Sequence, residues 1–299
     1  MSASTASHKI SYVYGVIASP KNYFAEMAAV SMSTLRAAAP GARIVALTDG
    51  PTSEISFPAL EIVRSLVDEW VVEDLPADWS GVQRSRHLAL KMRHLIDGHI
   101  VQLDADTLIA HDPSDIANHS TDFAAVADIY DMPEGDLLRV HQENGWEISS
   151  PYMNGGVWSA RDTQAMRDFF DEAYALWVEG GTKGIYSDQY AISRALKKTS
   201  LPMTWLPLKY NFYMSYLGKV YMKPSIYHVF SGDFDTRLDT LLHILAKSLK
   251  TTGQLDEDLL ESFRRDKNPW TRPSHPKQFY ALGRPVSAVA AKLRKILER

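Results

Sequence analysis

Strand-like and helix-like segments alternate along the first hundred residues of the chain, and this alternation constrains the fold more than any other feature. Predicted strands cover residues 10–18, 43–47, part of 60–72 and 99–103, and predicted helices cover residues 22–39 and about 85–96. Each helix carries one apolar face, and the first and last strands are apolar throughout, as strands buried on both faces are. The order predicts an α/β protein with a mainly parallel, twisted sheet flanked by helices.

Composition indicates one large globular domain with an appended tail. Of the 299 residues, 45 % are hydrophobic, which is ordinary for a protein with a packed core. We expect a disordered segment at residues 1–9, a globular domain at 10–262 and a tail at 263–299. The absence of Cys excludes disulfides and thiolate metal sites. A net charge of −4 argues against nucleic acid as a partner.

The tail is basic, although the chain as a whole is acidic. From residue 264 onward there are ten Lys or Arg and only two acids, Asp266 and Glu298, so the tail carries +8 and the rest −12. Val289, Leu293 and Ile296 share one face of a predicted short helix, together with Leu297. Such a helix could lie on an anionic membrane surface or pack on the domain with its charges solvated.

Residues 1–9 are too short and polar for a signal peptide. No apolar run approaches the ~18–20 residues that a membrane-spanning helix needs. The expected location is therefore cytoplasmic, with the tail as a possible peripheral contact at the inner face of the membrane.

Two acids follow the fourth predicted strand. Asp104 and Asp106 lie one residue apart just after the apolar residues 99–103. Ligands of parallel sheets collect at the carboxyl ends of strands, and paired carboxylates suit Mg²⁺ or Mn²⁺. A metal there can neutralise a diphosphate and stabilise it as a leaving group.

The same pair of acids has two other interpretations. An isolated Asp-x-Asp is most often a solvated turn. Phosphohydrolases that form an aspartyl-phosphate also end a strand in this pattern, but with a threonine two places after the second acid, and Thr107 stands one place early. That family normally carries the motif on its first strand, so the phosphohydrolase interpretation is the weaker one.

Further polar residues each have an ordinary structural explanation. A predicted strand at 122–129 ends near Asp128, and a strongly periodic helix covers 163–179. Asn154-Gly155-Gly156 is typical of a tight turn. Ser187 can cap a helix that begins with Asp188, an acid favoured there by the helix dipole.

Segments in a particular order resemble the GT-A-fold glycosyltransferases, closest to the retaining family 8 that includes glycogenin and bacterial lipopolysaccharide galactosyl- and glucosyltransferases. The resemblance spans roughly residues 10 to 235. The segments are the first strand into Ile17-Ala18-Ser19, the helix with Arg86 and Lys91, Leu103 to Thr107, Tyr152 to Val157, Ser187-Asp188-Gln189, and Ile226 to Gly232 around His228.

The resemblance implies a metal site and a donor site. Asp106 would ligate Mn²⁺ or Mg²⁺, Asp104 would ligate it or hold the ribose, and His228 would be the third ligand. Without the upstream acids, a satisfied core histidine would be the better interpretation of His228.

The resemblance assigns the remaining residues to the donor. Asn154, Gly155 and Gly156 would lie against the sugar, although family members usually have Ser or Ala in place of Gly155. Asp188 would accept hydrogen bonds from sugar hydroxyls, Gln189 would lie near the anomeric carbon, and Asp128 could reach a hydroxyl. Arg86 and Lys91 would face the diphosphate, and Ala18 and Tyr23 the base. For either cation alone a solvated helix charge is the simpler explanation, and Tyr23 suits the core better than base stacking.

The implied activity is transfer of a hexose-type sugar from a nucleotide diphosphate, usually UDP, to a glycan or lipid-linked acceptor with retention. Retention by front-face departure and attack is favoured because Gln189 is a poor nucleophile. The family's late lysine is missing, and residues 233–237 replace its segment, with Arg237 as a conceivable substitute. A metal-dependent nucleotidyltransferase or sugar-nucleotide hydrolase and a catalytically silent sugar-nucleotide-binding relative are the alternatives.

Overall fold

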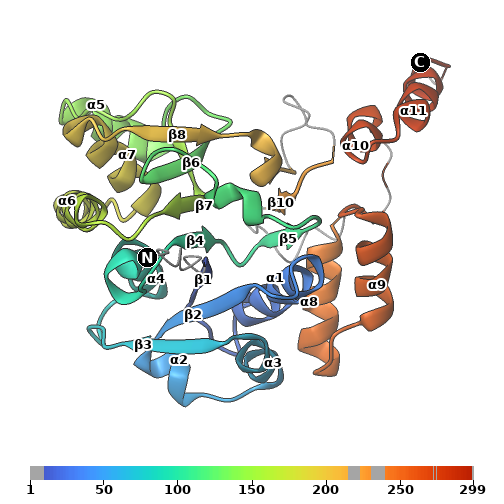
Figure 1. Cartoon of the computed structure of the whole chain (residues 1–299), viewed down its shortest axis with the longest axis horizontal. Helices are drawn as coiled ribbons and strands as arrows, with labels where there is room; N and C mark the ends of the chain where they lie inside the picture. The colour runs from blue at the N-terminus through green and yellow to red at the C-terminus, as the bar shows by residue number, and fades with distance from the viewer. Residues whose placement is uncertain (1–9, 215–222, 230–239, 272, 274, 298–299) are drawn as a thin grey trace, which may run out of the picture.

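A seven-stranded sheet forms the centre of the molecule (Figure 1). The computed structural model describes residues 10–214, 223–229, 240–271, 273 and 275–297. In the order in which they pair, the strands are β3 (Glu69–Glu73), β2 (Arg43–Asp49), β1 (Ser11–Val16), β4 (Ile100–Leu103), β7 (Met153–Ala160), β6 (Phe123–Ala127) and β8 (Met203–Leu206). Every neighbouring pair is parallel except those of β7, which runs antiparallel to β4 and β6. The predicted α/β fold with a mainly parallel sheet is confirmed.

Helices cover both faces of this sheet. The helices that the structure describes are α1 (Phe24–Ala38), α2 (Gly50–Glu54), α3 (Pro58–Leu66), α4 (Gly81–Leu95), α5 (Gly135–Glu143), α6 (Gln164–Gly181), α7 (Asp188–Thr199), α8 (Leu241–Thr252), α9 (Glu257–Asp266), α10 (Pro276–Ala281) and α11 (Pro285–Leu297), with the 3-10 turns η1 (Ser114–Ala117) and η2 (Leu208–Tyr210). Along β1, Tyr12 and Tyr14 pack with α1 and α3, whereas Val13 packs with α4, α6 and α7. Alternate side chains therefore enter two different cores, and this is why β1 is apolar throughout.

A second, three-stranded sheet lies beside the first. It consists of β5 (Thr107–Ile109), β10 (Ile226–His228) and β9 (Phe212–Tyr213), with β10 in the middle. β10 pairs antiparallel with β5 and places His228 opposite Thr107. Its apolar side packs with α8 and α9 in a third core. The Asp-x-Asp turn between β4 and β5 thus joins the two sheets.

Side-chain caps decide where several helices begin. Thr163 and Ser187 accept hydrogen bonds from the backbone amides of Met166 and Tyr190. The predicted cap at Ser187 is confirmed, and of the two candidates for the other helix, Asp162 and Thr163, the second is the cap. α4 begins at Gly81, earlier than predicted, because Ser80 and Gln83 form a reciprocal capping box.

The strand expected within residues 60–72 is confirmed: β3 begins at Glu69, after α3, which runs to Leu66. Two other local predictions are wrong. The prolines at 269, 273, 276 and 285 predict an extended stretch, but this stretch contains α10. Asn154-Gly155-Gly156 is the start of strand β7 and not a tight turn. The residues on either side of this glycine-rich segment are paired, Met153 with β6 and Val157 with β4, and this holds the segment extended although its local sequence favours a turn.

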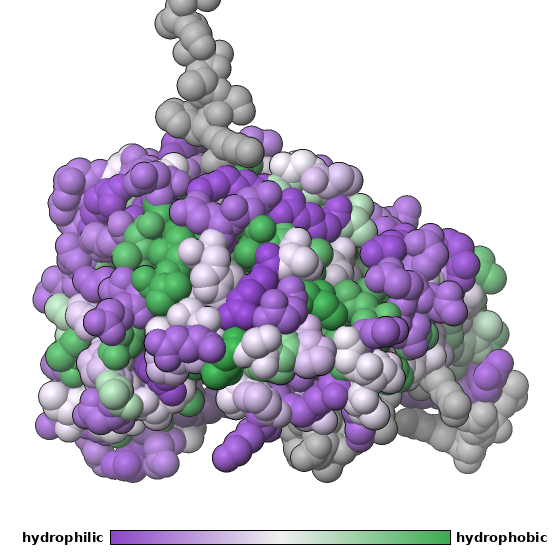
Figure 2. All heavy atoms as spheres, turned by 90° about the horizontal axis from the view of Figure 1, so that it is seen from below, coloured by the Kyte–Doolittle hydropathy of each residue, from purple (hydrophilic) through white to green (hydrophobic). Residues whose placement is uncertain are grey.

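The carboxyl-terminal part begins inside the packed body and ends away from it. α9 continues across the boundary expected after residue 262, and Trp270 is buried in the third core. α11 stands at the periphery beside α10 (Figure 1), with Val286, Val289, Leu293 and Ile296 each more than half exposed. Among the helices that the structure describes, none has the length and apolarity to cross a bilayer. On the face seen in Figure 2, apolar areas are separated by polar ones.

Candidate functional site

A cavity of about 660 Å³ opens at one edge of the large sheet. β1 and β4 end there, and because β7 runs the other way, its first residues meet them at the same edge. The amide of Asp104 donates to the carbonyl of Gly156 at 2.9 Å, which ties the Asp-x-Asp turn to the start of β7. The amino-terminal ends of α4 and α7 close the cavity from the side.

Most of the site residues predicted from the sequence lie together in this cavity. Those that line it are Arg86, Asp104, Asp106, Asp128, Asn154, Gly155, Gly156, Asp188, Gln189 and His228. Three nominated residues do not line it. Ala18 is buried with its amide donating to Thr52, and Tyr23 packs under the ammonium group of Lys250. Lys91 lies against Asp171 and the ring of Tyr174, so its charge is directed away from the cavity.

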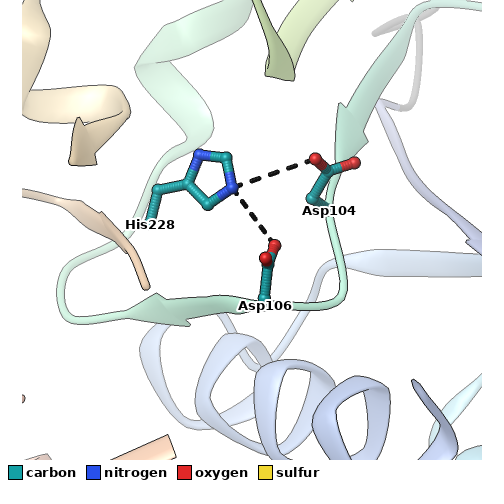
Figure 3. Close-up of side chains that lie close together, drawn as sticks. All are labelled: Asp104, Asp106 and His228. Atoms are coloured by element: carbon teal, nitrogen blue, oxygen red, sulfur yellow. Dashed lines mark ion pairs between the residues drawn. The ribbon is translucent and has the colours of Figure 1, made fainter. Parts of the chain in front are cut away.

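Asp104, Asp106 and His228 form a compact group of possible metal ligands (Figure 3). Nε2 of His228 lies 3.2 Å from a carboxylate oxygen of Asp106 and 3.9 Å from one of Asp104. One ligand atom from each residue falls within 4.8 Å of the other two. The pairing of β10 with β5 produces this convergence, since it sets His228 beside the turn that holds both acids.

The spacing of these atoms fits a divalent cation. Six ligands at about 2.1 Å from a metal would lie about 3 Å apart when adjacent and about 4.2 Å apart when opposite. The distances of 3.2 and 3.9 Å fall within that range. Two carboxylates and an imidazole can accommodate either Mn²⁺ or Mg²⁺, and the imidazole favours the former.

Electrostatic interactions shift the protonation of this group. Burial and the nearby charge of Asp106 raise the pKa of Asp104 to about 6. Burial alone would lower the pKa of His228, but the charges of Asp106 and Asp104 and a hydrogen bond to Asp106 outweigh it, so this pKa is raised. Because the pKa values of Asp104 and His228 are raised, a cation would compete with protons at these two groups.

Buried amides connect His228 to the other end of the cavity. Nδ1 of His228 lies 2.9 Å from Oδ1 of Asn211, whose Nδ2 donates to Oδ1 of Asn154 at 2.7 Å. Asn154 and Gln189 each donate to the carboxylate of Asp128, at 2.8 and 3.0 Å. The amide of Gly155 donates to Oε1 of Gln189 at 2.9 Å, so both polar groups of that side chain are engaged.

The N-terminus of α7 brings an acid and a cation together. Asp188 is the first residue of the helix and is buried, and Arg86 from α4 reaches it at 3.3 Å. The negative charge of Asp188 raises the pKa of Arg86 above its ordinary value. Among the described residues that line the cavity, Arg86 alone carries a permanent positive charge, against four aspartates.

Sequence reasoning missed several residues of the site. Asn211 is the most important, and nothing in its local sequence distinguishes it from a loop asparagine. Phe24 and Val82 also line the cavity, and both are unusually exposed for apolar residues. The substitute cation considered at Arg237, with Phe230 and Gly232, lies outside the described residues.

Sequence comparison finds no match to this chain, whereas structural comparison finds similar proteins. No protein-family model matches it, and no curated protein matches it by sequence. Among solved structures, the galactosyltransferase LgtC, in complex with donor and acceptor sugar analogues, is 18 % identical and matches over 73 % of this chain and 86 % of its own, with a TM-score of 0.54. The fold of this chain is that of a GT-A glycosyltransferase.

Two further structures agree with that fold. Mouse xyloside xylosyltransferase 1 is 13 % identical and matches over 77 % of this chain and 99 % of its own, with a TM-score of 0.54. The glycosyltransferase GlyE of Streptococcus pneumoniae TIGR4 is 14 % identical and matches over 90 % of this chain and 67 % of its own, with a TM-score of 0.50. The predicted GT-A fold is confirmed, and at these identities the likeness establishes the fold alone.

Proposed function

We propose that this protein is a metal-dependent glycosyltransferase that moves a hexose-type sugar from a nucleotide diphosphate, with UDP as the expected carrier. The observation that carries the proposal is the convergence of Asp104, Asp106 and His228 in a large cavity of a GT-A fold. Segments more than a hundred residues apart supply these groups, so their meeting is a property of the fold and not of local sequence.

The charge balance of the cavity supports a requirement for Mn²⁺ or Mg²⁺. Four aspartates line the described part of it, and only Arg86 opposes them with a permanent charge. A dianionic diphosphate would be repelled by this surface unless another cation were present. A divalent ion held by Asp104, Asp106 and His228 would supply charge that stabilises the diphosphate as it leaves.

The far end of the cavity suits the donor sugar. Asp188 and Asp128 offer carboxylate oxygens to hydroxyl groups. The space that side chains at Gly155 and Gly156 would take is filled by Gln189 and His228, so the two glycines allow these residues to lie close to the start of β7. The amide of Gln189 is engaged with Asp128 and Gly155, and an amide is in any case a poor nucleophile. We therefore favour retention by departure and attack on one face of the sugar.

We propose that the acceptor is a glycan or a lipid-linked sugar. We further propose that the tail binds the cytoplasmic side of a membrane with an anionic surface. α11 exposes a face formed by Val289, Leu293 and Ile296, while Lys292 and Lys295 lie beside it. An exposed apolar stripe flanked by cations is typical of helices that lie in a membrane interface.

The test is a thermal-shift panel of nucleotide sugars, with and without Mn²⁺, on the native chain and on Asp106→Ala. We expect one nucleotide sugar to raise Tm only with metal and only in the native chain. The exposed Asp97, outside the cavity, supplies the control Asp97→Ala, which should behave as the native chain does. No metal-dependent shift with any nucleotide sugar would contradict the proposal.

Proton NMR of the reaction with the stabilising donor then distinguishes the activities. Transfer to an added acceptor with the donor's anomeric configuration supports the retaining transferase. Release of free sugar alone would point to a hydrolase, and an inverted product anomer would contradict retention.

A further inference from the structure

The hydrogen-bond directions in the buried amide network can be derived from one backbone group. The N–H of Gly156 can only donate, and it points at the side chain of Asn154 at 2.9 Å. The atom of Asn154 that it meets must therefore be Oδ1. This orientation turns Nδ2 of Asn154 toward the carboxylate of Asp128 at 2.8 Å, which can only accept when ionised.

The same reasoning then orients Asn211. Its side chain lies 2.7 Å from Oδ1 of Asn154, an acceptor, so the atom that Asn211 places there is Nδ2. Its Oδ1 consequently faces Nδ1 of His228 at 2.9 Å. An amide oxygen accepts only, so Nδ1 of the ring must carry a proton. The neutral imidazole has one N–H, so in that form Nε2 is left with a lone pair directed at Asp104 and Asp106. In the charged ring Nε2 also carries a proton, which hydrogen-bonds to Asp106.

We propose that Asn211 is a positioning residue that holds His228 in the tautomer able to ligate a metal through Nε2. Asn211 is 3 % exposed and follows the short turn η2, so water does not readily replace its oxygen. Without that oxygen, the ring would be free to place its proton on Nε2, where Asp106 lies 3.2 Å away. A proton at that position competes directly with a cation.

The inference rests on the proposed metal site but concerns a residue that does not touch the metal. Hydrogen bonds to the distant nitrogen of a ligating histidine fix its tautomer, and their loss weakens metal binding by about 10- to 100-fold. Asn211 could instead serve only to fill the core between β9 and β7, and suitable substitutions distinguish these roles.

Two substitutions at Asn211 separate positioning from packing. Asn211→Leu has similar volume but no acceptor, whereas Asn211→Asp keeps an oxygen for Nδ1 of His228 while placing a second one against Oδ1 of Asn154. We expect Asn211→Asp to lower Tm and retain Mn²⁺ affinity, and Asn211→Leu to lose affinity. Asn144→Leu is the control, because the side chain of Asn144 donates to the carbonyl of Val140 at the end of α5, away from the cavity.

The primary measurement is the Kd for Mn²⁺ by titration calorimetry on the full chain without nucleotide. We expect the Kd of Asn211→Leu to rise by about 10- to 100-fold, and those of Asn211→Asp and Asn144→Leu to stay within about threefold of the native value. An unchanged Kd in Asn211→Leu would overturn the inference and leave the proposed function intact. No Mn²⁺ binding by the native chain would instead remove the metal site and both claims with it.

Nitrogen-15 NMR of the metal-free native chain provides an independent test, and it remains decisive if Asn211→Leu fails to fold. The neutral ring of His228 should show its proton on Nδ1. A proton found on Nε2 would overturn the inference whatever the calorimetry showed.

Discussion

At the scale of single residues, Gly156 has the least room for a side chain among the glycines that the structure describes. A Cβ placed there would lie 2.4 Å from Cε1 and 2.8 Å from Nδ1 of His228. Any side chain must therefore push His228 out of its hydrogen bond with Asn211 and away from the two acids. The glycine is required by what packs against it and not by its backbone conformation, which is that of an ordinary strand.

We expect Gly156→Ala to destabilise the protein by about 1 to 3 kcal/mol and to weaken Mn²⁺ binding at least about tenfold, because overpacking displaces a ligand. Gly41→Ala is the matched control, since a Cβ at Gly41 meets no atom within 4 Å. Denaturant unfolding and Mn²⁺ titration of both variants check this. Equal Mn²⁺ affinity in the two variants would show that His228 is not a ligand or can move without cost.

Protons and metal compete for the same atoms. The pKa of Asp104 is raised to about 6 and that of His228 is also raised, so both groups bind protons more readily than usual as the pH falls. A metal requires both groups deprotonated. We therefore expect Mn²⁺ affinity to fall steadily from pH 7.5 to pH 5, as measured by titration calorimetry, and a constant Kd over that range would contradict these shifts.

The same pKa shift predicts an effect on stability. A raised pKa means that the surroundings disfavour the ionised carboxylate, which destabilises the folded protein above that pKa. Asp104→Asn should therefore raise the Tm of the metal-free protein at pH 7.5 by about 1 to 3 °C. The hydrogen bond from Gln102 to residue 104 survives the change, because Asn keeps an acceptor oxygen. Added Mn²⁺ should then raise the Tm of the native chain but not of the variant. A lower Tm in the metal-free variant would indicate that the carboxylate stabilises the fold.

At the scale of elements, the start of α7 connects helix formation with the site. The hydroxyl of Ser187 accepts from the amide of Tyr190 at 3.2 Å and so fixes where the helix begins. Asp188 and Gln189 are its first two residues, and both line the cavity. Fraying of this end would therefore displace two residues assigned to the donor.

We expect Ser187→Ala to cost about 1 kcal/mol of stability, as loss of a cap does, and also to weaken binding of the donor. Thr163→Ala is the control: it removes the corresponding cap of α6, from the amide of Met166, at a place outside the cavity. Both variants should unfold at lower denaturant concentration, but only Ser187→Ala should alter the Kd for the nucleotide sugar. Equal effects on that Kd would mean that global stability, and not the position of α7, sets the affinity.

At the scale of the whole molecule, an acidic body carries a basic end. The residues from 264 onward hold +8 and the rest of the chain −12, and α11 presents its cations beside exposed apolar residues. An anionic surface would attract this end and repel the body. Such a charge distribution would orient the molecule on a membrane as well as bind it.

We expect Lys292→Glu combined with Lys295→Glu to reduce binding to phosphatidylglycerol vesicles by at least about tenfold, since each cation near such a surface contributes about 1 kcal/mol. Lys183→Glu combined with Lys247→Glu changes the net charge equally at exposed sites outside the tail and should have a smaller effect. Vesicle sedimentation measures both, with phosphatidylcholine vesicles as the neutral reference. Equal losses in the two variants would show that net charge, and not α11, governs binding.

The sequence by itself determined the elements whose signals are local. The apolar residues of β1 and β4, the periodic faces of α1 and α6, and the capping hydroxyls of Thr163 and Ser187 can each be recognised within a few residues. Their order predicted the mainly parallel sheet, because parallel neighbours need helical connections. The position of Asp104 and Asp106 at the end of a strand followed from the same pattern.

Only the tertiary structure decided which distant groups meet. Asn154-Gly155-Gly156 has the local character of a turn, yet pairing of the flanking residues with β4 and β6 makes it part of a strand. β10 is three residues long and takes its place from its pairing with β5, which brings His228 to the acids. Asn211 and the outward direction of Lys91 likewise depend on packing partners far along the chain. No local window encodes these contacts, since their free energy comes from pairing and burial between segments that become neighbours only in the folded chain.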